Sequence, residues 1–142
     1  MWSTIEVDGH PCEIYEPSQP SEHGYVLIYL HGVSGEWLND KAEFTEQFEK
    51  HGIRVIGPRT KRSWWSNKIC PEFDSERSAE TYVRDNILTY VENQWGVSAP
   101  RVGLLGTSMG GQGALRFSYK YPGVFPIVAA ISPAIDYHLR LK

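Results

Sequence analysis

The chain has 142 residues, of which 41% are hydrophobic and 13% aromatic, and its 14 Lys+Arg against 17 Asp+Glu give a formal net charge of −3. This composition excludes a disordered polyelectrolyte, and the lack of excess basic groups makes nucleic acid a poor candidate partner. The length fits one domain, residues 1–142, with a single core.

The sequence predicts neither a membrane span nor a secretory signal. Its longest apolar run, residues 25–30, is far shorter than the roughly 20 residues that cross a bilayer. The first six residues lack the basic and apolar segments that begin a signal peptide. We therefore expect a cytoplasmic protein with no membrane partner. Cys12 and Cys70 form no CxxC pair, which favours two free thiols.

The apolar pattern predicts six strands. Residues 2–8 and 12–16 alternate apolar and polar side chains on either side of a Gly-His-Pro segment, which indicates an antiparallel hairpin. Three later segments are apolar throughout, as in strands buried within a sheet. A fourth segment, between the first and second of these, is a short strand. In chain order these strands are expected at residues 25–30, 53–58 (the short one), 102–105 and 127–131.

Three segments between those strands have apolar residues at helical spacing, namely residues 39–51, 75–95 and 111–121. The helix at 75–95 is the clearest, because one apolar stripe runs along it. Its charged residues are expected to face away from the core: Glu80, Arg84, Asp85 and Glu92. Strands that alternate with helices predict an α/β fold, with a mostly parallel sheet and helices on both faces.

The segment Gly106-Thr107-Ser108-Met109-Gly110 matches the pattern G-x-S-x-G and lies directly between a predicted strand and a predicted helix. At so sharp a turn, the residues two before and two after the serine must be small, and both are glycine here. The N-terminus of the helix would direct N–H groups and partial positive charge toward the serine, which favours a developing oxyanion. The pattern therefore predicts Ser108 as a nucleophile.

Other interpretations of this segment are weaker. Ser108 could be an ordinary helix N-cap, but a strand before it and a helix after it favour the nucleophile. A phosphate-binding P-loop would need lysine where Gln112 stands. A dinucleotide-binding motif would need glycine where Arg116 stands. Neither nucleotide motif is therefore present.

The turn after residues 25–30 is the second candidate part of the site. Acyl transfer to serine needs a backbone donor in addition to the N–H that follows the nucleophile. The segment His31-Gly32-Val33 can supply it, so the N–H groups of Val33 and Met109 are the expected oxyanion donors. We expect His31 to hydrogen-bond nearby loop backbone and shape the turn, rather than to act as the general base.

These segments resemble a known family. Residues 102–115 (VGLLGTSMGGQGAL), followed by Tyr-Pro-Gly-Val-Phe at 121–125 and Ala-Ile-Ser-Pro at 130–133, resemble the putative esterase (esterase D-like) branch of the α/β-hydrolases. That branch includes S-formylglutathione hydrolases, feruloyl esterases and mycolyltransferases. The resemblance covers about residues 25–132 and implies an eight-stranded fold, carboxyl-ester or thioester substrates and a Ser-Asp-His triad. It also implies oxyanion donors at Val33 and Met109.

The resemblance also implies that part of the fold is missing. In the family, the triad acid and histidine follow the seventh and eighth strands, whereas six strands are predicted here. We therefore expect the N-terminal portion of a longer hydrolase, truncated after the sixth strand, with the acid and histidine beyond Lys142. Asp136 and His138 are expected to be loop residues. Residues 127–131 would then form an exposed sheet edge, and this chain alone would be nearly inert.

The long connection at residues 58–74 carries weaker signals. Trp64 and Trp65 could line a substrate pocket or simply pack under the loop. Four basic residues of this connection could attract an acidic substrate, although a solvated loop is the favoured interpretation: Arg59, Lys61, Arg62 and Lys68.

The sequence as a whole predicts a serine-dependent hydrolase of small-molecule carboxylic esters or thioesters that works through an acyl-enzyme. We expect no cofactor, and no metal site either, because His10, His23 and His51 lack metal-ligand spacing. An acyltransferase or serine peptidase on the same fold, and a non-catalytic binding module, stay as alternatives. The sequence does not predict the oligomeric state.

Overall fold

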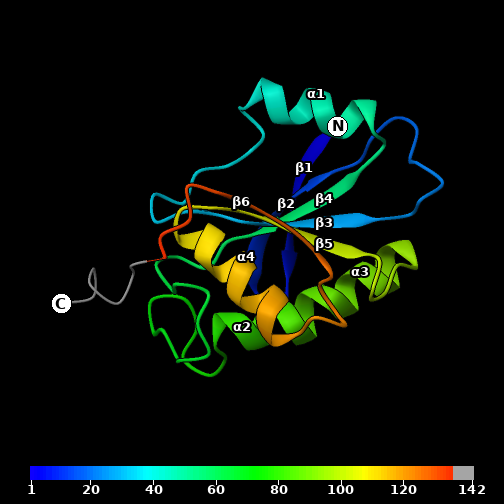
Figure 1. Cartoon of the computed structure of the whole chain (residues 1–142). Helices are drawn as coiled ribbons and strands as arrows, with labels where there is room; N and C mark the ends of the chain where they lie inside the picture. Colours follow the sequence, from blue (N-terminus) through cyan, green and yellow to red (C-terminus); the bar gives the residue numbers. More distant parts are fainter. Residues whose placement is uncertain (136–142) are drawn as a thin grey trace.

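The computed structural model describes residues 1–135, so Asp136 and His138 lie outside the described part. Six strands form one sheet in the order β1-β2-β4-β3-β5-β6. Helix α1 (Ala42–Lys50) covers one face, and the other helices cover the opposite face (Figure 1). The predicted α/β fold with helices on both faces is confirmed. Within the described residues, no helix is long and apolar enough to cross a membrane.

The strands pair as the sequence pattern indicated. Antiparallel strands β1 (Trp2–Val7) and β2 (His10–Tyr15) form the hairpin, and β2 continues antiparallel onto β4 (Arg54–Pro58). The next three pairings are parallel, from β4 through β3 (Val26–Leu30) to β5 (Val102–Thr107), and then to a last strand. The carboxyl ends of the parallel strands therefore meet at one edge, where α/β sheets bind their ligands.

That last strand, β6 (Ile127–Ile131), differs from the prediction of a buried strand. It lies at the end of the strand order and pairs only with β5 among the described residues. As a result, Ile127 and Ile131 are 50% and 41% exposed. The exposed sheet edge expected at this position is confirmed.

The predicted helix at 75–95 begins later, at Ala79, because the Ser78 hydroxyl caps it by accepting the Thr81 N–H (3.1 Å). It runs through three consecutive segments: α2 (Ala79–Thr81), a π-helical segment η1 (Tyr82–Ile87), and α3 (Leu88–Trp95). Gly96 ends it in the left-handed conformation that favours glycine. Helix α4 (Met109–Lys120) begins directly after Ser108.

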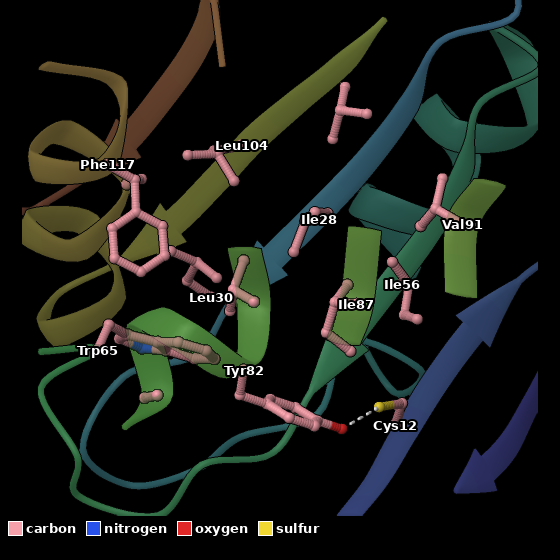
Figure 2. Close-up of a cluster of buried hydrophobic side chains, with 14 of the residues drawn as sticks. Cys12, Ile28, Leu30, Ile56, Trp65, Tyr82, Ile87, Val91, Leu104 and Phe117 are labelled. Atoms are coloured by element: carbon pink, nitrogen blue, oxygen red, sulfur yellow. Dashed lines mark hydrogen bonds between the residues drawn. The ribbon is translucent and has the colours of Figure 1, made fainter. Parts of the chain in front are cut away.

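The larger part of the core lies between the sheet and α2, η1, α3 and α4 (Figure 2). In it, Tyr82 and Cys12 are fully buried, and their hydroxyl and thiol lie 3.7 Å apart. Burial raises the pKa of Cys12 to about 11, so this thiol stays protonated and unreactive. Cys12 and Cys70 are both free, as predicted. A smaller apolar cluster, which includes Phe48, packs between the sheet and α1.

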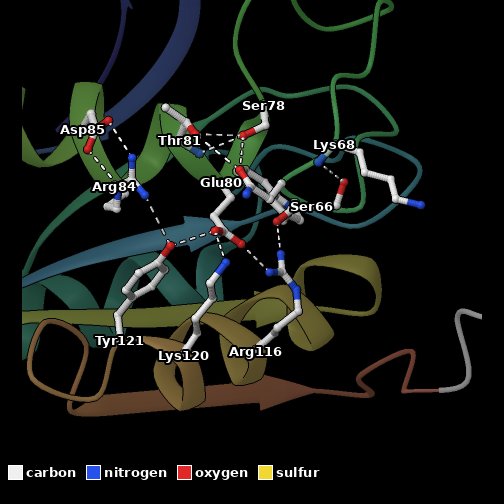
Figure 3. Close-up of polar contacts among 12 residues, drawn as sticks. Ser66, Lys68, Ser78, Glu80, Thr81, Arg84, Asp85, Arg116, Lys120 and Tyr121 are labelled. Atoms are coloured by element: carbon white, nitrogen blue, oxygen red, sulfur yellow. Dashed lines mark hydrogen bonds and ion pairs between the residues drawn. The ribbon is translucent and has the colours of Figure 1, made fainter.

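Glu80 corrects one prediction, because its side chain is buried rather than directed away from the core. The carboxylate accepts hydrogen bonds from Lys120 (2.6 Å), from the Tyr121 hydroxyl (2.7 Å) and from Arg116 (Figure 3). Burial alone would raise the pKa of Glu80, but these partners outweigh it and lower the pKa to about 2. The two adjoining helical segments, α2 and α4, are therefore joined by an ionised network.

Candidate active site

Ser108 occupies the turn between β5 and α4 with φ 55° and ψ −111°, a region that residues other than glycine rarely adopt. Hydrogen bonds hold this backbone on both sides. The Ser108 N–H donates to the Ile131 carbonyl (2.9 Å), and the Ser108 carbonyl accepts from Ala134 (3.0 Å) and Gln112 (3.2 Å). The side chain is partly exposed. The chain thus fixes a strained serine where a ligand can reach it.

The glycines of this serine turn (residues 106–110) are required by close backbone contacts. A Cβ at Gly106 would lie 2.0 Å from the Gly110 carbonyl oxygen, and one at Gly110 would lie 1.8 Å from the Leu30 carbonyl oxygen. A Cβ at Gly111 would come 2.9 Å from the Pro133 Cα. Neither strand backbone nor helix backbone can rotate away from such a contact. The predicted need for small residues on both sides of the serine is confirmed.

The 31–33 turn lies beside the serine turn. A Cβ at Gly32 would come 3.5 Å from the Ser108 Cβ and 3.2 Å from the Thr107 carbonyl oxygen. Within residues 1–135 the Val33 N–H has no hydrogen-bond acceptor. Met109 is the first residue of α4, so its N–H has no acceptor within the helix. Both N–H groups proposed from the sequence therefore belong to turns that meet at Ser108.

Glu36 fastens the 31–33 turn, a role that the sequence did not indicate. Its carboxylate accepts hydrogen bonds from the Ser34 hydroxyl (2.6 Å), the Tyr29 hydroxyl (3.1 Å) and the Gly32 N–H (3.3 Å). Burial raises the pKa of Glu36, but these donors outweigh it and lower the pKa to about 2. The Tyr29 hydroxyl also lies 3.2 Å from the Thr107 hydroxyl, so the network reaches the serine turn.

His31 is buried and has both ring nitrogens engaged. Nε2 accepts the Thr60 N–H (3.0 Å), so Nδ1 carries the proton and donates it to the Gly32 carbonyl (2.7 Å). Burial lowers the pKa of His31 to about 4, which keeps the ring neutral at pH 7. The prediction that His31 hydrogen-bonds loop backbone is confirmed, and the ring has no free nitrogen with which to activate Ser108.

Trp64 and Trp65 differ in their burial. Trp65 has no exposed surface: its ring packs against Gly113, and its Nε1–H donates to the His31 carbonyl (3.1 Å). Of the two alternatives given for Trp65, the structure favours packing under the loop over a pocket lining, because Gly113 leaves room for the indole beneath α4. Trp64 is half-buried, and its carbonyl accepts from Gln112 Nε2 (2.6 Å). A pocket-lining role for Trp64 stays a prediction.

The described residues do not supply a base for Ser108. No hydrogen bond joins the Ser108 hydroxyl to a side chain within residues 1–135. His10 is paired with Asp74 (2.8 Å), and His23 Nε2 lies 3.2 Å from the His51 carbonyl. In the same part of the chain, no three His, Cys, Asp or Glu side chains gather closely enough to hold a metal ion.

Several solved structures share this fold. The S-formylglutathione hydrolase from Agrobacterium tumefaciens superposes with a TM-score of 0.73 at 18% identity, over 94% of this chain and 56% of that chain. Mycobacterium tuberculosis MPT51 (FbpC1) superposes with a TM-score of 0.73 at 17% identity, over 94% of this chain and 51% of that chain. The fluorophosphonate-binding serine hydrolase FphF of Staphylococcus aureus superposes with a TM-score of 0.70 at 18% identity, over 92% of this chain and 56% of that chain. The chain therefore spans about half the length of each of these structures.

The sequence itself matches a family over most of its length. The family model described as Putative esterase aligns with residues 10–139 of the 142. This range includes the 31–33 turn and the serine turn. The chain therefore belongs to the putative esterase family, and it shares its fold with the solved structures above.

Proposed function

We propose that the whole protein containing this chain hydrolyses carboxylic esters or thioesters by attack of Ser108 on the acyl carbon. The observation that carries the proposal is the backbone of Ser108, which is held at φ 55° beside glycines where an added Cβ would collide with main-chain atoms. Strain of this kind persists where the surrounding structure enforces it, and it concentrates at functional sites. Membership of an esterase family supports the same chemistry.

In the proposed mechanism, the Ser108 Oγ forms a bond to the acyl carbon while the carbonyl oxygen becomes an oxyanion. The N–H groups of Val33 and Met109 donate to that oxyanion. It forms at the N-terminal end of α4, where the helix dipole favours negative charge. The C–O or C–S bond then breaks, and the leaving group departs with a proton. Water cleaves the acyl-enzyme to release the acid. The base that accepts the Ser108 proton would come from outside residues 1–135.

Labelling with a fluorophosphonate probe tests this proposal on the whole protein. We expect the probe to modify Ser108, and Ser108→Ala to abolish both the labelling and ester hydrolysis. Ser132→Ala is the matched control, because Ser132 is also exposed, also has positive φ (46°), and lies at the end of the neighbouring strand. Persistent hydrolysis in a folded Ser108→Ala protein would refute the assignment. A folded whole protein that neither reacts with the probe nor hydrolyses esters would indicate a binding module.

A further inference from the structure

A groove of about 480 Å³ opens beside the 31–33 turn, between the loops that follow β3 and β4. Val33 lines this groove and also carries one of the proposed oxyanion donors. A substrate whose reacting carbonyl lies at Ser108 can therefore extend into the groove. The lining includes the following basic and aromatic residues, and we call it the basic groove: His10, Trp37, Arg59, Lys61, Arg62 and Phe73.

Arg59 is the most unusual member of the basic groove, because it is half-buried and has no ion pair within residues 1–135. Its guanidinium lies 4.1 Å from the centre of the Trp37 ring and donates one hydrogen bond to the Glu36 carbonyl (2.8 Å). Its other N–H groups stay available, and burial lowers the pKa of Arg59 by disfavouring the charged form. An anion bound here would offset that cost of burial.

Two carboxylates lie near enough to Arg59 to attract it, but both are occupied elsewhere. Glu13 is buried and accepts the N–H groups of Leu38 (2.8 Å) and Asn39 (3.1 Å). The Glu36 carboxylate holds the 31–33 turn, as described above. Neither forms an ion pair with the guanidinium. Within residues 1–135, the hydrogen bond to the Glu36 carbonyl therefore uses only part of the fork of donors that suits a carboxylate.

The remaining basic residues of the loop after β4 separate into paired and unpaired ones. Arg62 donates to Glu72 (3.0 Å) and is thereby neutralised. Lys61 is exposed, lines the groove and has no ion pair among the described residues. Lys68 is exposed but does not line the groove. Arg59 and Lys61 thus form a local positive site in a protein whose net charge is −3.

We propose that Arg59 and Lys61 bind a carboxylate carried by the ester or thioester substrate, so that the protein prefers anionic esters over neutral ones. This proposal rests on the proposed function, since it places the reacting carbonyl at Ser108. The Trp37 and Phe73 rings give the same groove apolar surface for the rest of the substrate. The carboxylate can belong either to the acyl part or to the alcohol part, and the choice of probes decides between these two.

Two pairs of phenyl esters test the proposal on the whole protein. 3-Acetoxybenzoate carries the carboxylate on the alcohol part, monophenyl glutarate carries it on the acyl part, and the neutral match of each has a carboxamide instead. We expect the anionic-to-neutral ratio of kcat/KM to fall about fivefold in Lys61→Glu for at least one pair, and about tenfold or more in Arg59→Gln. Lys68→Glu is the matched control and should leave the ratio unchanged. Added salt should lower the wild-type ratio.

The outcomes separate this inference from the proposed function. Ser108-dependent hydrolysis with the same ratio in wild type, Lys61→Glu and Arg59→Gln would overturn the anion site and leave the esterase standing. If the wild type hydrolyses none of the four esters, calorimetric titration of the Ser108→Ala protein with 3-acetoxybenzoate and monophenyl glutarate decides. Weaker binding after Lys61→Glu but not after Lys68→Glu supports the site, and equal or undetectable binding in all variants overturns it.

Discussion

Replacement of Gly110 by alanine tests whether the serine turn depends on close contact between β3 and α4. The new Cβ would lie 1.8 Å from the Leu30 carbonyl oxygen, whereas real Cβ contacts do not fall below 3.0 Å. Strand and helix would therefore have to separate by about 1 Å, and both partners are main chain. Overpacking of this kind costs typically 1–3 kcal/mol, and the rigid contact places Gly110→Ala at about 3 kcal/mol.

Urea denaturation and thermal melting of the whole protein measure this cost. For a protein about twice as long as this chain, about 3 kcal/mol corresponds to a fall in Tm of about 5 °C. Gly123→Ala is the matched control, because a Cβ at Gly123 meets nothing within 4 Å, and its effect should stay within about 0.5 kcal/mol. We also expect Gly110→Ala to react more slowly with the fluorophosphonate probe. If both variants melt like the wild type, the packing argument for the serine turn is wrong.

Two further substitutions test the ionised networks. Glu80→Gln keeps the size of the side chain but loses its charge, so it should destabilise the protein by about 2 kcal/mol at pH 7 in urea unfolding. Because the folded-state pKa of Glu80 is lowered from 4.5 to about 2, this stabilisation is present above pH 4.5 and is lost as pH falls toward 2. If the stability difference between wild type and Glu80→Gln stays constant over that range, the ionised network around Glu80 is refuted. Glu36→Gln weakens the hydrogen bond from the Gly32 N–H and should lower kcat about tenfold with little change in KM. Asp40→Asn is the matched control, because Asp40 is an exposed acid of the same loop, and it should leave kcat unchanged. Equal kcat values for these two variants would show that Glu36 does not position the turn.

The sequence predicted the features that depend on local spacing. Alternating and continuous apolar runs located all six strands, and the positions of Gly106 and Gly110 around Ser108 indicated a tight turn that the structure confirms. The position of His31 at the end of β3 was also sufficient to predict hydrogen bonds to loop backbone. In each case the relevant partners are close in sequence or follow from the strand order.

The features that the sequence missed depend on partners far along the chain. Glu80 lies beside the apolar stripe of its helix, and its burial becomes favourable through donors 36 to 41 residues later in the chain, namely Arg116, Lys120 and Tyr121. Trp65, in the loop after β4, enters the core because Gly113 in α4 leaves space for its ring. Glu36 belongs to a loop without periodicity, so nothing in the pattern distinguishes it from a solvated acid. Contacts of this kind require the three-dimensional structure.

In the proposed function, the junction at His31 makes substrate selectivity separable from the geometry of the serine turn. The loop after β4 joins the 31–33 turn through the Thr60 N–H, which donates to His31 Nε2, and through the Trp65 Nε1–H, which donates to the His31 carbonyl. Lys61 and Arg62 line the groove and make neither of these hydrogen bonds. If the protein acts as proposed, evolution or a protein engineer can exchange Lys61 and Arg62 to change which esters are accepted while Ser108 and its surroundings keep their arrangement.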